Sequence, residues 1–226
     1  MTLEEAMRCR HTVRRYTDRK LPGEILEALN GRIGKHNLES GLAMNLVTEN
    51  TEAFGPLLRL FLAKGVRHYV ILAGRDRPGL DETLGYRGAD VMLFAQTLGL
   101  NSWWVGRTFR RKGLQKNAAP EAERILGLLA LGYGATQGVP HKSKKPEDIA
   151  AYEGEAPEWF RKGTEALLLA PTALNRQAFS LRGEGRRVAM TCVGGAFSGV
   201  ELGIGRYHFE LGAGKENFDW ISPDIE

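Results

Sequence analysis

The chain has 226 residues, of which 42% are hydrophobic and 26% charged, and this composition is ordinary for a globular protein of one substantial domain or two small ones. The net charge of +4, from 31 basic and 27 acidic side chains, does not indicate a nucleic-acid-binding protein unless the charges cluster. The two cysteines, Cys9 and Cys192, exclude a cysteine-based metal site or disulfide framework, and we expect reduced thiols in a cytoplasmic protein.

The chain begins with a helix signal. Thr2 and Glu5 have the spacing of a capping box, which predicts a short helix that ends near Cys9. Glu4 and Glu5, with no apolar core segment beside them, argue against a signal peptide. No apolar run approaches the ~20 residues of a membrane span, so we expect no membrane partner.

A basic segment follows, with the sequence Arg10-His11-Thr12-Val13-Arg14-Arg15-Tyr16. If it is extended, alternate side chains share a face, so Arg10, Thr12 and Arg14 point the same way. Two guanidinium groups and a hydroxyl on one side can clamp a phosphate, because the forked donors of Arg match its oxygens. The alternative is a solvated basic segment, and these residues alone favour that alternative.

Hydrophobic periodicity predicts helices and strands over the next hundred residues. The strongest pattern is a helix over 81–98, in which Gly85 and Gly88 leave room for another helix to pack closely. The other elements expected in this part of the chain are helices over 24–35, 55–64 and 120–126 and strands over 44–48, 68–73 and 128–131.

The segment 100–109 indicates a loop that leads into a short strand ending at Gly106. A glycine at this place lets a ligand approach the backbone N–H closely. Trp103 and Trp104 either stack on a planar ring or pack in the core, and the sequence leaves both possibilities open. The glycine-rich run 132–138 lacks the GxGxxG spacing and opens no helix, so we expect no dinucleotide-binding Rossmann domain.

A second basic cluster, Pro140-His141-Lys142-Ser143-Lys144-Lys145-Pro146, has Lys142 and Lys144 on one side if it is extended. Alone it indicates a solvated linker, and its poor aromatic interleaving argues against nucleic acid. A polar bridge over 147–158 separates it from the last part of the chain. The elements expected there are helices over 159–169 and 199–211 and strands over 178–182 and 187–193.

A polar turn, Ala170-Pro171-Thr172-Ala173-Leu174-Asn175-Arg176-Gln177, lies between the first of those helices and the first of those strands. Pro171 fixes its own φ, while Thr172 and Asn175 can bond nearby backbone or a ligand, so a capping loop and a binding turn are equally open. His208 is expected to be a packed or hydrogen-bonded histidine, because no second ligand stands at metal spacing. No nucleophile or metalloprotease motif is visible, so any chemistry is expected to come from a cofactor.

Four stretches together resemble the flavin-dependent nitroreductase family, and the resemblance covers most of the chain. They are Arg10, Thr12 and Arg14 (Arg-x-Ser-x-Arg/Lys in the family), 85–106 (the central helix and the loop beneath the flavin ring), Lys142-Ser143-Lys144 (Lys-Ser-Arg) and 171–177 (Pro-Ser-x-x-Asn-x-Gln). The resemblance implies an α+β nitroreductase-like fold, with a mixed or antiparallel central sheet flanked by helices.

The order of these motifs departs from the family pattern. In the family the turn motif lies a few dozen residues after the first motif, but the corresponding stretch 34–42 lacks it here. In the family homodimer, one subunit supplies the phosphate clamp of each flavin site and the other supplies the turn. This chain therefore resembles a single-chain pseudo-dimer with a pseudo-twofold internal duplication. Residues 1–150 would be the half with the clamp and 151–226 a shortened half that completes the site, which implies a monomer with one flavin.

The resemblance further implies an FMN-dependent oxidoreductase that passes hydride from NAD(P)H to a small electrophile such as a nitroaromatic or a quinone. The residues implied for the phosphate are Arg10, Thr12, Arg14, Lys142 and Lys144. Those implied for the ring are Trp104, Val105, Gly106, Pro171, Thr172, Ala173 and Asn175, with the Gly106 N–H as the catalytic contact to flavin N5; Asn175 either bonds the ring or fixes the turn. The resemblance implies no side-chain acid or base and no metal.

Two other classes of function remain as alternatives. The first is a catalytically inactive relative that binds flavin or another phosphorylated ligand as a sensor or carrier. The second, ranked last, is a basic nucleic-acid-binding domain, which would bind DNA or RNA in a salt-dependent way and contain no flavin.

Overall fold

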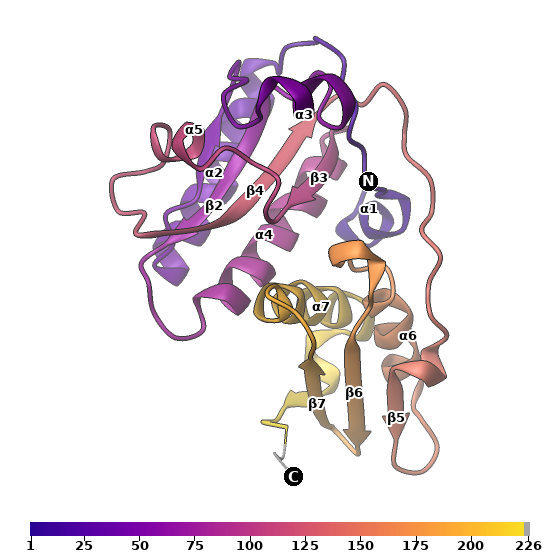
Figure 1. The fold of residues 1–226 in the computed structure, drawn as a ribbon. Helices are drawn as coiled ribbons and strands as arrows, with labels where there is room; N and C mark the ends of the chain where they lie inside the picture. Colours follow the sequence, from indigo (N-terminus) through magenta and orange to yellow (C-terminus); the bar gives the residue numbers. More distant parts are fainter. Residues whose placement is uncertain (224–226) are drawn as a thin grey trace.

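The computed structural model describes residues 1–223, in which two four-stranded sheets lie on either side of a pair of crossing helices (Figure 1). The first sheet has the order β1-β2-β4-β3 and is antiparallel throughout, whereas the second, β5-β6-β7-β8, is mixed. The strands are β1 (Asn45–Val47), β2 (His68–Gly74), β3 (Asn101–Val105), β4 (Arg124–Gly132), β5 (Ala150–Tyr152), β6 (Phe179–Glu184), β7 (Arg187–Cys192) and β8 (Asp219–Trp220). The expected α+β class is confirmed, with two sheets in place of one central sheet.

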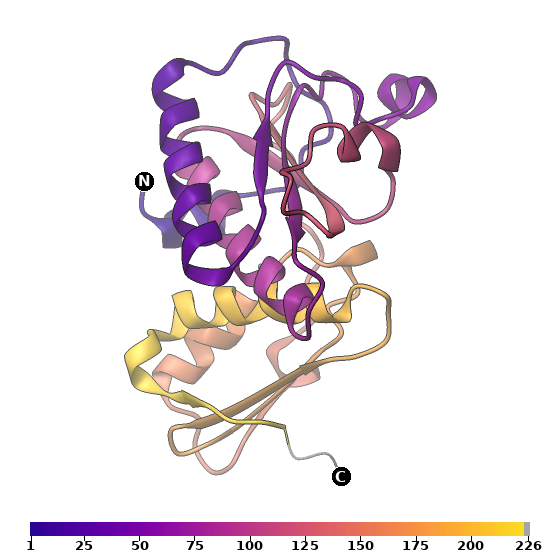
Figure 2. The ribbon, with the colours of Figure 1, turned by 90° about the vertical axis from the view of Figure 1, so that its left-hand side faces the viewer.

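Six of the seven α-helices in the described residues correspond to predicted ones, and α5 (Arg111–Gln115) was not predicted. The other six are α1 (Leu3–Cys9), α2 (Gly23–Ser40), α3 (Pro56–Phe61), α4 (Leu80–Thr97), α6 (Glu158–Leu167) and α7 (Ser198–Ala213). The capping box is confirmed, because Thr2 Oγ1 accepts from the Glu5 N–H at 3.1 Å and the Glu5 carboxylate accepts from the Thr2 N–H at 2.8 Å. Figure 2 shows α2 and α4 along one face of the first sheet. Within residues 1–223 no helix is both long enough and apolar enough to cross a bilayer.

The prediction of a helix over 120–126 is wrong. A turn precedes Arg124, where β4 begins, and the short helix α5 lies earlier in the chain. Arg124 and Ile125 pair with Gly74 and Ala73 of β2, so ladder hydrogen bonds outweigh the local helix propensity of this segment. The expected strand over 128–131 is the central part of β4. The bridge over 147–158 also contains β5, which pairs in parallel with β6.

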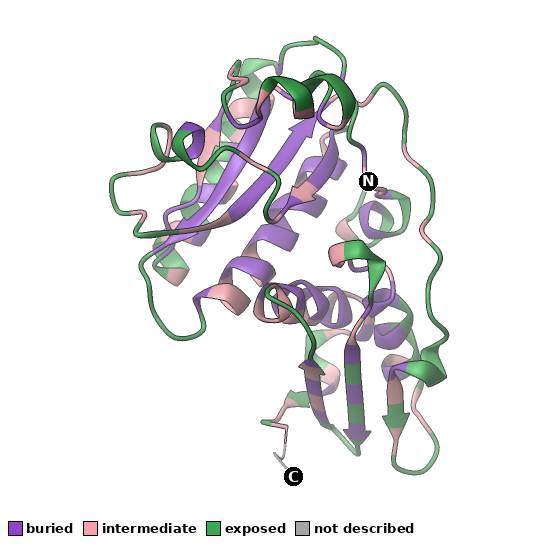
Figure 3. Ribbon diagram, in the orientation of Figure 1, coloured by how far each residue is buried: buried purple, intermediate pink, exposed green. Residues whose placement is uncertain are grey.

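The two sheets differ in how many of their faces are covered, and this difference explains the hydrophobic patterns of their strands. Every residue of β2 is buried, because α2 and α4 cover one face of the first sheet and α3 and α5 lie over the other (Figures 1 and 3). In β6, buried and exposed residues alternate, which is the pattern of a sheet with one covered face. One core cluster nevertheless runs from Met7 to Phe218 and joins both sheets through α4 and α7.

The crossing of α4 and α7 is unusually close. A Cβ added to Gly85 of α4 would lie 2.1 Å from the Val200 carbonyl oxygen of α7, and one added to Gly203 would lie 2.0 Å from the Glu82 carbonyl oxygen. Only glycine fits at such contacts, so the close helix packing expected at Gly85 is confirmed.

A buried carboxylate ties the same helices together. Asp90 of α4 accepts two hydrogen bonds from Arg32 of α2, both at 2.6 Å, and one from the Tyr207 hydroxyl of α7 at 2.6 Å, while His36 Nε2 lies 2.5 Å away. Burial alone would raise the pKa of Asp90, but the hydrogen bonds from His36, Arg32 and Tyr207 outweigh it and hold the pKa below its usual range.

Asp90→Asn should lower the free energy of unfolding by about 3 kcal/mol or more, because it leaves Arg32 half-buried without its charge partner. Chemical denaturation at neutral pH measures this loss. Glu147→Gln, which removes only an exposed pair with Lys145, should change stability by less than about 0.5 kcal/mol. Similar losses for the two variants would contradict this account.

The depressed pKa of Asp90 also sets the sign of a pH effect. A carboxyl whose pKa is lower in the folded state stabilises the fold above its unfolded pKa of about 3.9, and this contribution disappears as the pH falls through the folded pKa. Wild type should therefore lose more stability than Asp90→Asn as the pH falls from about 5 to 2.

Candidate functional site

A pocket of about 110 Å³ lies where the N-terminal segment, the end of β3 and the start of α7 meet. Its walls come from both ends of the chain, and seven of its residues were predicted from the sequence. The lining residues are Thr12, Arg14, Trp103, Trp104 and Gly106 on one side and Pro171, Thr172, Ala173, Phe197, Val200, Glu201 and Ile204 on the other.

The first wall is held by the edge strand β3. The Val13 N–H donates to the Ser102 carbonyl oxygen at 3.0 Å, which fixes the N-terminal segment beside this strand. Trp103 stacks on Phe54 with ring centroids 5.7 Å apart, and Trp104 packs against Gly88 of α4. The two indoles therefore pack in the core and also border the pocket, so neither possibility left open by the sequence excludes the other.

Arg10 does not line the pocket with Thr12 and Arg14, although alternation predicted a shared face. It is 5% exposed, and its Nε has no hydrogen-bond partner among the described residues. Burial lowers the pKa of Arg10 to about 10. A buried guanidinium with an unpaired N–H is energetically costly, which makes this position favourable for an anion.

His208 of α7 is packed, as expected. Its Nδ1 donates to the Ile204 carbonyl oxygen at 2.8 Å, and the residue is fully buried. Burial, and to a smaller extent the charge of Arg10, lower the pKa of His208 to about 3, so the imidazole is neutral. A neutral imidazole adds no positive charge beside Arg10.

The turn that forms the second wall has an unusual backbone. Leu174, Asn175 and Gln177 have φ angles of 54°, 55° and 46°, which lie in a backbone region that residues other than glycine rarely adopt. The Gln177 N–H donates to Thr172 Oγ1 at 3.0 Å and closes the turn. The buried Gln177 side chain donates to the Leu168 carbonyl oxygen at 2.8 Å. The turn is therefore fixed by its own polar residues.

The second basic cluster is attached to this turn. The Lys144 N–H donates to Gln177 Oε1 at 2.7 Å, Lys144 Nζ donates to the Gln177 carbonyl oxygen at 3.0 Å, and Asn175 Nδ2 donates to the Lys142 carbonyl oxygen at 2.7 Å. Two motifs separate in sequence thus meet. Lys142, Lys144 and Asn175 are exposed and do not line the pocket, and Val105 is buried, also outside the lining. Of the two roles expected for Asn175, these contacts correspond to fixing the turn.

Four lining residues at the start of α7 were not predicted as site residues. Val200 and Ile204 were assigned to the apolar face of that helix, and only the fold shows that this face continues into the pocket. Phe197 lies directly over Gly106, because a Cβ added there would be 2.6 Å from the aromatic ring. Glu201 is buried, and one of its oxygens accepts from the Ala173 N–H at 2.6 Å. The one sequence signal that could have marked Glu201 is an acidic residue beside Val200 at the start of the predicted helix over 199–211.

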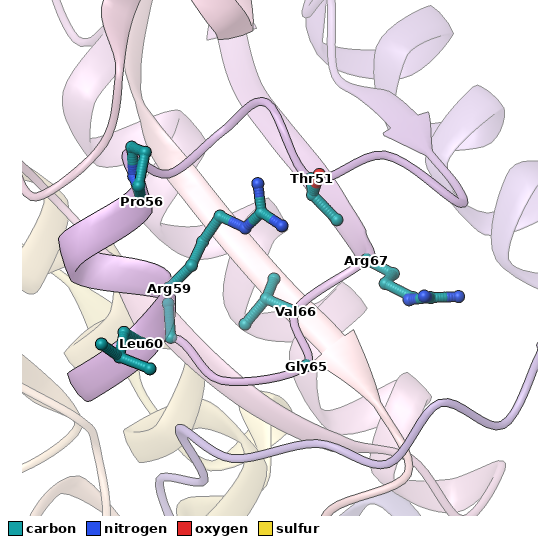
Figure 4. Close-up of a pocket in the computed structure, with 8 residues that line it drawn as sticks. Thr51, Pro56, Arg59, Leu60, Gly65, Val66 and Arg67 are labelled. Carbon is teal, nitrogen blue, oxygen red and sulfur yellow. The ribbon is translucent and has the colours of Figure 1, made fainter.

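A larger pocket of about 400 Å³ lies between α3 and the segment 63–67 (Figure 4). Arg59 extends from α3 toward the side formed by Thr51, and Arg67 forms an exposed ion pair with Glu49 at 3.3 Å. Arg59 is exposed as well, so the cations of this pocket are solvated. Arginine side chains in this setting are typical of a surface, and we assign no site here.

The cysteines have different surroundings. Cys9 is exposed, whereas Cys192 is buried and its Sγ lies 3.6 Å from a Glu201 carboxylate oxygen. Burial, together with the Glu201 charge, raises the pKa of Cys192 to about 12, which suppresses thiolate formation. Within residues 1–223 no group of three or more His, Cys, Asp or Glu side chains could hold a metal ion.

Comparisons with known proteins agree with this architecture. The family model described as "Putative TM nitroreductase" matches residues 2–213. A protein from Thermotoga maritima, described as a putative nitroreductase, superimposes with a TM-score of 0.72 at 20% identity over 100% of this chain and 91% of its own. A putative nitroreductase in complex with FMN from Desulfovibrio desulfuricans has a TM-score of 0.51 at 15% identity, over 70% of this chain and 99% of its own. These structures share the fold of this chain. No curated protein matches the chain.

In the native protein, we expect only Cys9 to react with a maleimide at a pH of about 8, because Cys192 is buried and its pKa is raised. Thiol titration in buffer should give one equivalent, and titration in denaturant should give two. Cys9→Ser should be unreactive until it is unfolded. Rapid reaction of that variant in buffer would contradict the structural assignment of Cys192.

Proposed function

The chain belongs to the nitroreductase family described above, and from this premise we propose that it is an FMN-dependent oxidoreductase. In this proposal it passes hydride from NAD(P)H through bound flavin to a small electrophilic acceptor such as a nitroaromatic or a quinone. The observation that carries the proposal is the pocket itself. It unites Thr12, Arg14, Trp104 and Gly106 with Pro171, Thr172 and Ala173, all of which the family resemblance implied as flavin contacts.

The polar residues at the site fit a phosphate. Arg14 and Thr12 line the pocket, and the buried Arg10 has an Nε without a partner among the described residues. The buried charge of Arg10 would attract an anion bound at Thr12 and Arg14, although Arg10 itself is not part of the pocket lining. Lys142 and Lys144 are held beside the turn by Asn175 and Gln177 and would add positive potential rather than direct contacts.

The remaining lining residues suit a planar ring. Trp104, Val200 and Ile204 supply apolar surface, and Gly106 offers a backbone N–H once the Phe197 ring that lies over it has moved. In the proposal this N–H orients the flavin at N5, and the turn from Pro171 to Ala173 covers the other edge. Bound FMN would supply the hydride chemistry, while the chain supplies binding, orientation and exclusion of water.

The small size of the pocket favours a second candidate function, that of a sensor or carrier without turnover. At about 110 Å³ the pocket is smaller than the roughly 300–1,000 Å³ usual for ligand sites, and Phe197 occupies the space over Gly106. A flavin ring needs this side chain to move. A relative that binds flavin or another phosphorylated ligand without turnover, as a sensor or carrier, would tolerate a narrow pocket because no acceptor has to enter.

The proposal includes a layout in which residues 1–150 and 151–226 act as two unequal halves of one compact unit. The boundary falls at the start of β5, the first strand of the second sheet, and each half supplies one wall of the pocket. In this layout the chain acts as a cytoplasmic monomer with one flavin. Sedimentation of the flavin-loaded protein would measure both the mass and the stoichiometry.

Incubation with FMN followed by desalting should leave flavin absorption bands on the protein, and these bands should bleach when NADPH or NADH is added without oxygen. Acceptor added afterwards should restore them. Retained bands that fail to bleach would favour the sensor or carrier, and absence of bands would contradict the proposed function. Visible absorption spectroscopy distinguishes all three outcomes.

Loss of the Arg14 contact to the phosphate should weaken FMN binding by roughly 10- to 100-fold, because it removes a charge-assisted hydrogen bond, and loss of the buried charge of Arg10 should weaken it to a smaller extent. Arg14→Ala changes an exposed residue, and Arg10→Met keeps most of the buried volume, so both should fold. Arg15→Ala is the matched control, since Arg15 is exposed and does not line the pocket. Flavin fluorescence titration measures the dissociation constants; equal values for all three variants would refute the phosphate clamp.

A further inference from the structure

Glu201 is the one acidic side chain among the residues that line the pocket. It stands in the first turn of α7 and is 7% exposed. Val200 and Ile204, on the same helix, and Trp104 of β3 line the same pocket and supply its apolar surface. A carboxylate in such a place needs hydrogen-bond donors, since an unsatisfied buried charge is strongly destabilising.

Both oxygens of this carboxylate have uncharged donors. Oε1 accepts from the Ala173 N–H at 2.6 Å, and the thiol of Cys192 lies 3.6 Å from Oε2. The position near the positive end of the α7 dipole adds further stabilisation of a negative charge. Among the described residues, the donors that contact this carboxylate are therefore a backbone N–H and a thiol, and neither is a cation.

The Ala173 N–H bond connects Glu201 to the strained part of the turn. The next two residues, Leu174 and Asn175, both have positive φ, a conformation that costs about 1 kcal/mol or more per residue and persists only where neighbours enforce it. On the other side of the turn, Arg176 donates to the Gly194 carbonyl oxygen at 3.1 Å. Glu201 thus secures the start of this segment, where the turn borders the pocket.

We propose that Glu201 is a positioning residue that holds the turn from Pro171 to Ala173 against the pocket, and that its negative charge lowers the reduction potential of the bound flavin. This inference rests on the proposed function. Reduction adds electron density to the ring, and a fixed negative charge in apolar surroundings opposes that change more strongly than it would in water. The charge therefore favours donation of hydride from the reduced flavin to an acceptor.

Two substitutions separate the two roles. Glu201→Gln keeps an oxygen that can accept from the Ala173 N–H but removes the charge, whereas Glu201→Ala removes both. Glu210→Gln is the matched control: Glu210 is a buried carboxylate on the same helix, about 13 Å further along by the helical rise, hydrogen-bonded to Tyr86 and Trp220 outside the pocket.

The positioning role is tested without flavin. Amide hydrogen exchange at Ala173 should be at least about tenfold faster in Glu201→Ala than in wild type, and close to wild type in Glu201→Gln and in Glu210→Gln. Unchanged exchange in Glu201→Ala would overturn the positioning role. Because this measurement uses the apoprotein, its outcome is independent of the proposed function.

The charge role is tested through flavin affinity in two redox states. Glu201→Gln should bind reduced FMN about tenfold more tightly relative to oxidised FMN than wild type does, which raises the two-electron midpoint potential by about 30 mV. Glu210→Gln should leave this ratio unchanged. An equal ratio in Glu201→Gln and wild type would overturn the charge role while leaving the proposed function intact. Failure of wild type to bind FMN would instead contradict the proposed function, and the charge role with it.

Discussion

The close approach of α4 and α7 is the constraint on which the site depends. Gly85 lies against the carbonyl group of Val200, and Val200 is itself part of the pocket wall. A methyl group added at Gly85 would force α7 to shift, at a cost of about 1–3 kcal/mol for overpacking. The distance between the two walls is therefore set by glycines that never face the pocket, and a core contact determines the width of a surface feature.

Polar contacts fix the direction of the same crossing. Asp90 of α4 accepts from the Tyr207 hydroxyl of α7, and Glu82 of α4 pairs with Arg206 of α7. Close-packed glycines allow two helices to slide or rotate, whereas hydrogen bonds between buried side chains accept only one register. Packing therefore sets how close the helices lie, and this network sets which residues of α7 face the N-terminal half. Phe197, Val200, Glu201 and Ile204 reach the pocket as a result of that register.

Much of this arrangement was predictable from the sequence, and the limits have physical causes. Local patterns located most helices and strands, and short motifs located Thr12, Arg14, Gly106 and the turn at Pro171, because those signals lie within a few residues of one another. The local pattern over 120–126 predicted a helix, because the pairing of this segment with β2, some fifty residues away in the sequence, leaves no local signal. The predicted flavin contacts of Arg10 and Asn175 stay predictions, because the fold buries Arg10 outside the pocket lining and Asn175 donates to the Lys142 carbonyl oxygen. Phe197 carried no sequence signal, since its position depends wholly on the helix crossing.

The Phe197 ring over Gly106 has a consequence for how strongly any planar molecule can bind. In the free protein this ring shields the glycine backbone, and Arg107 lies 5.5 Å from its centroid in a cation–π contact. A planar molecule that binds at Gly106 must displace the Phe197 ring. The bound molecule and the Phe197 side chain therefore compete for the same space. The measured affinity is the difference between the binding free energy of the planar molecule and the free energy needed to displace Phe197. The more stable the Phe197 ring is over Gly106, the higher the concentration of the planar molecule that is needed for binding.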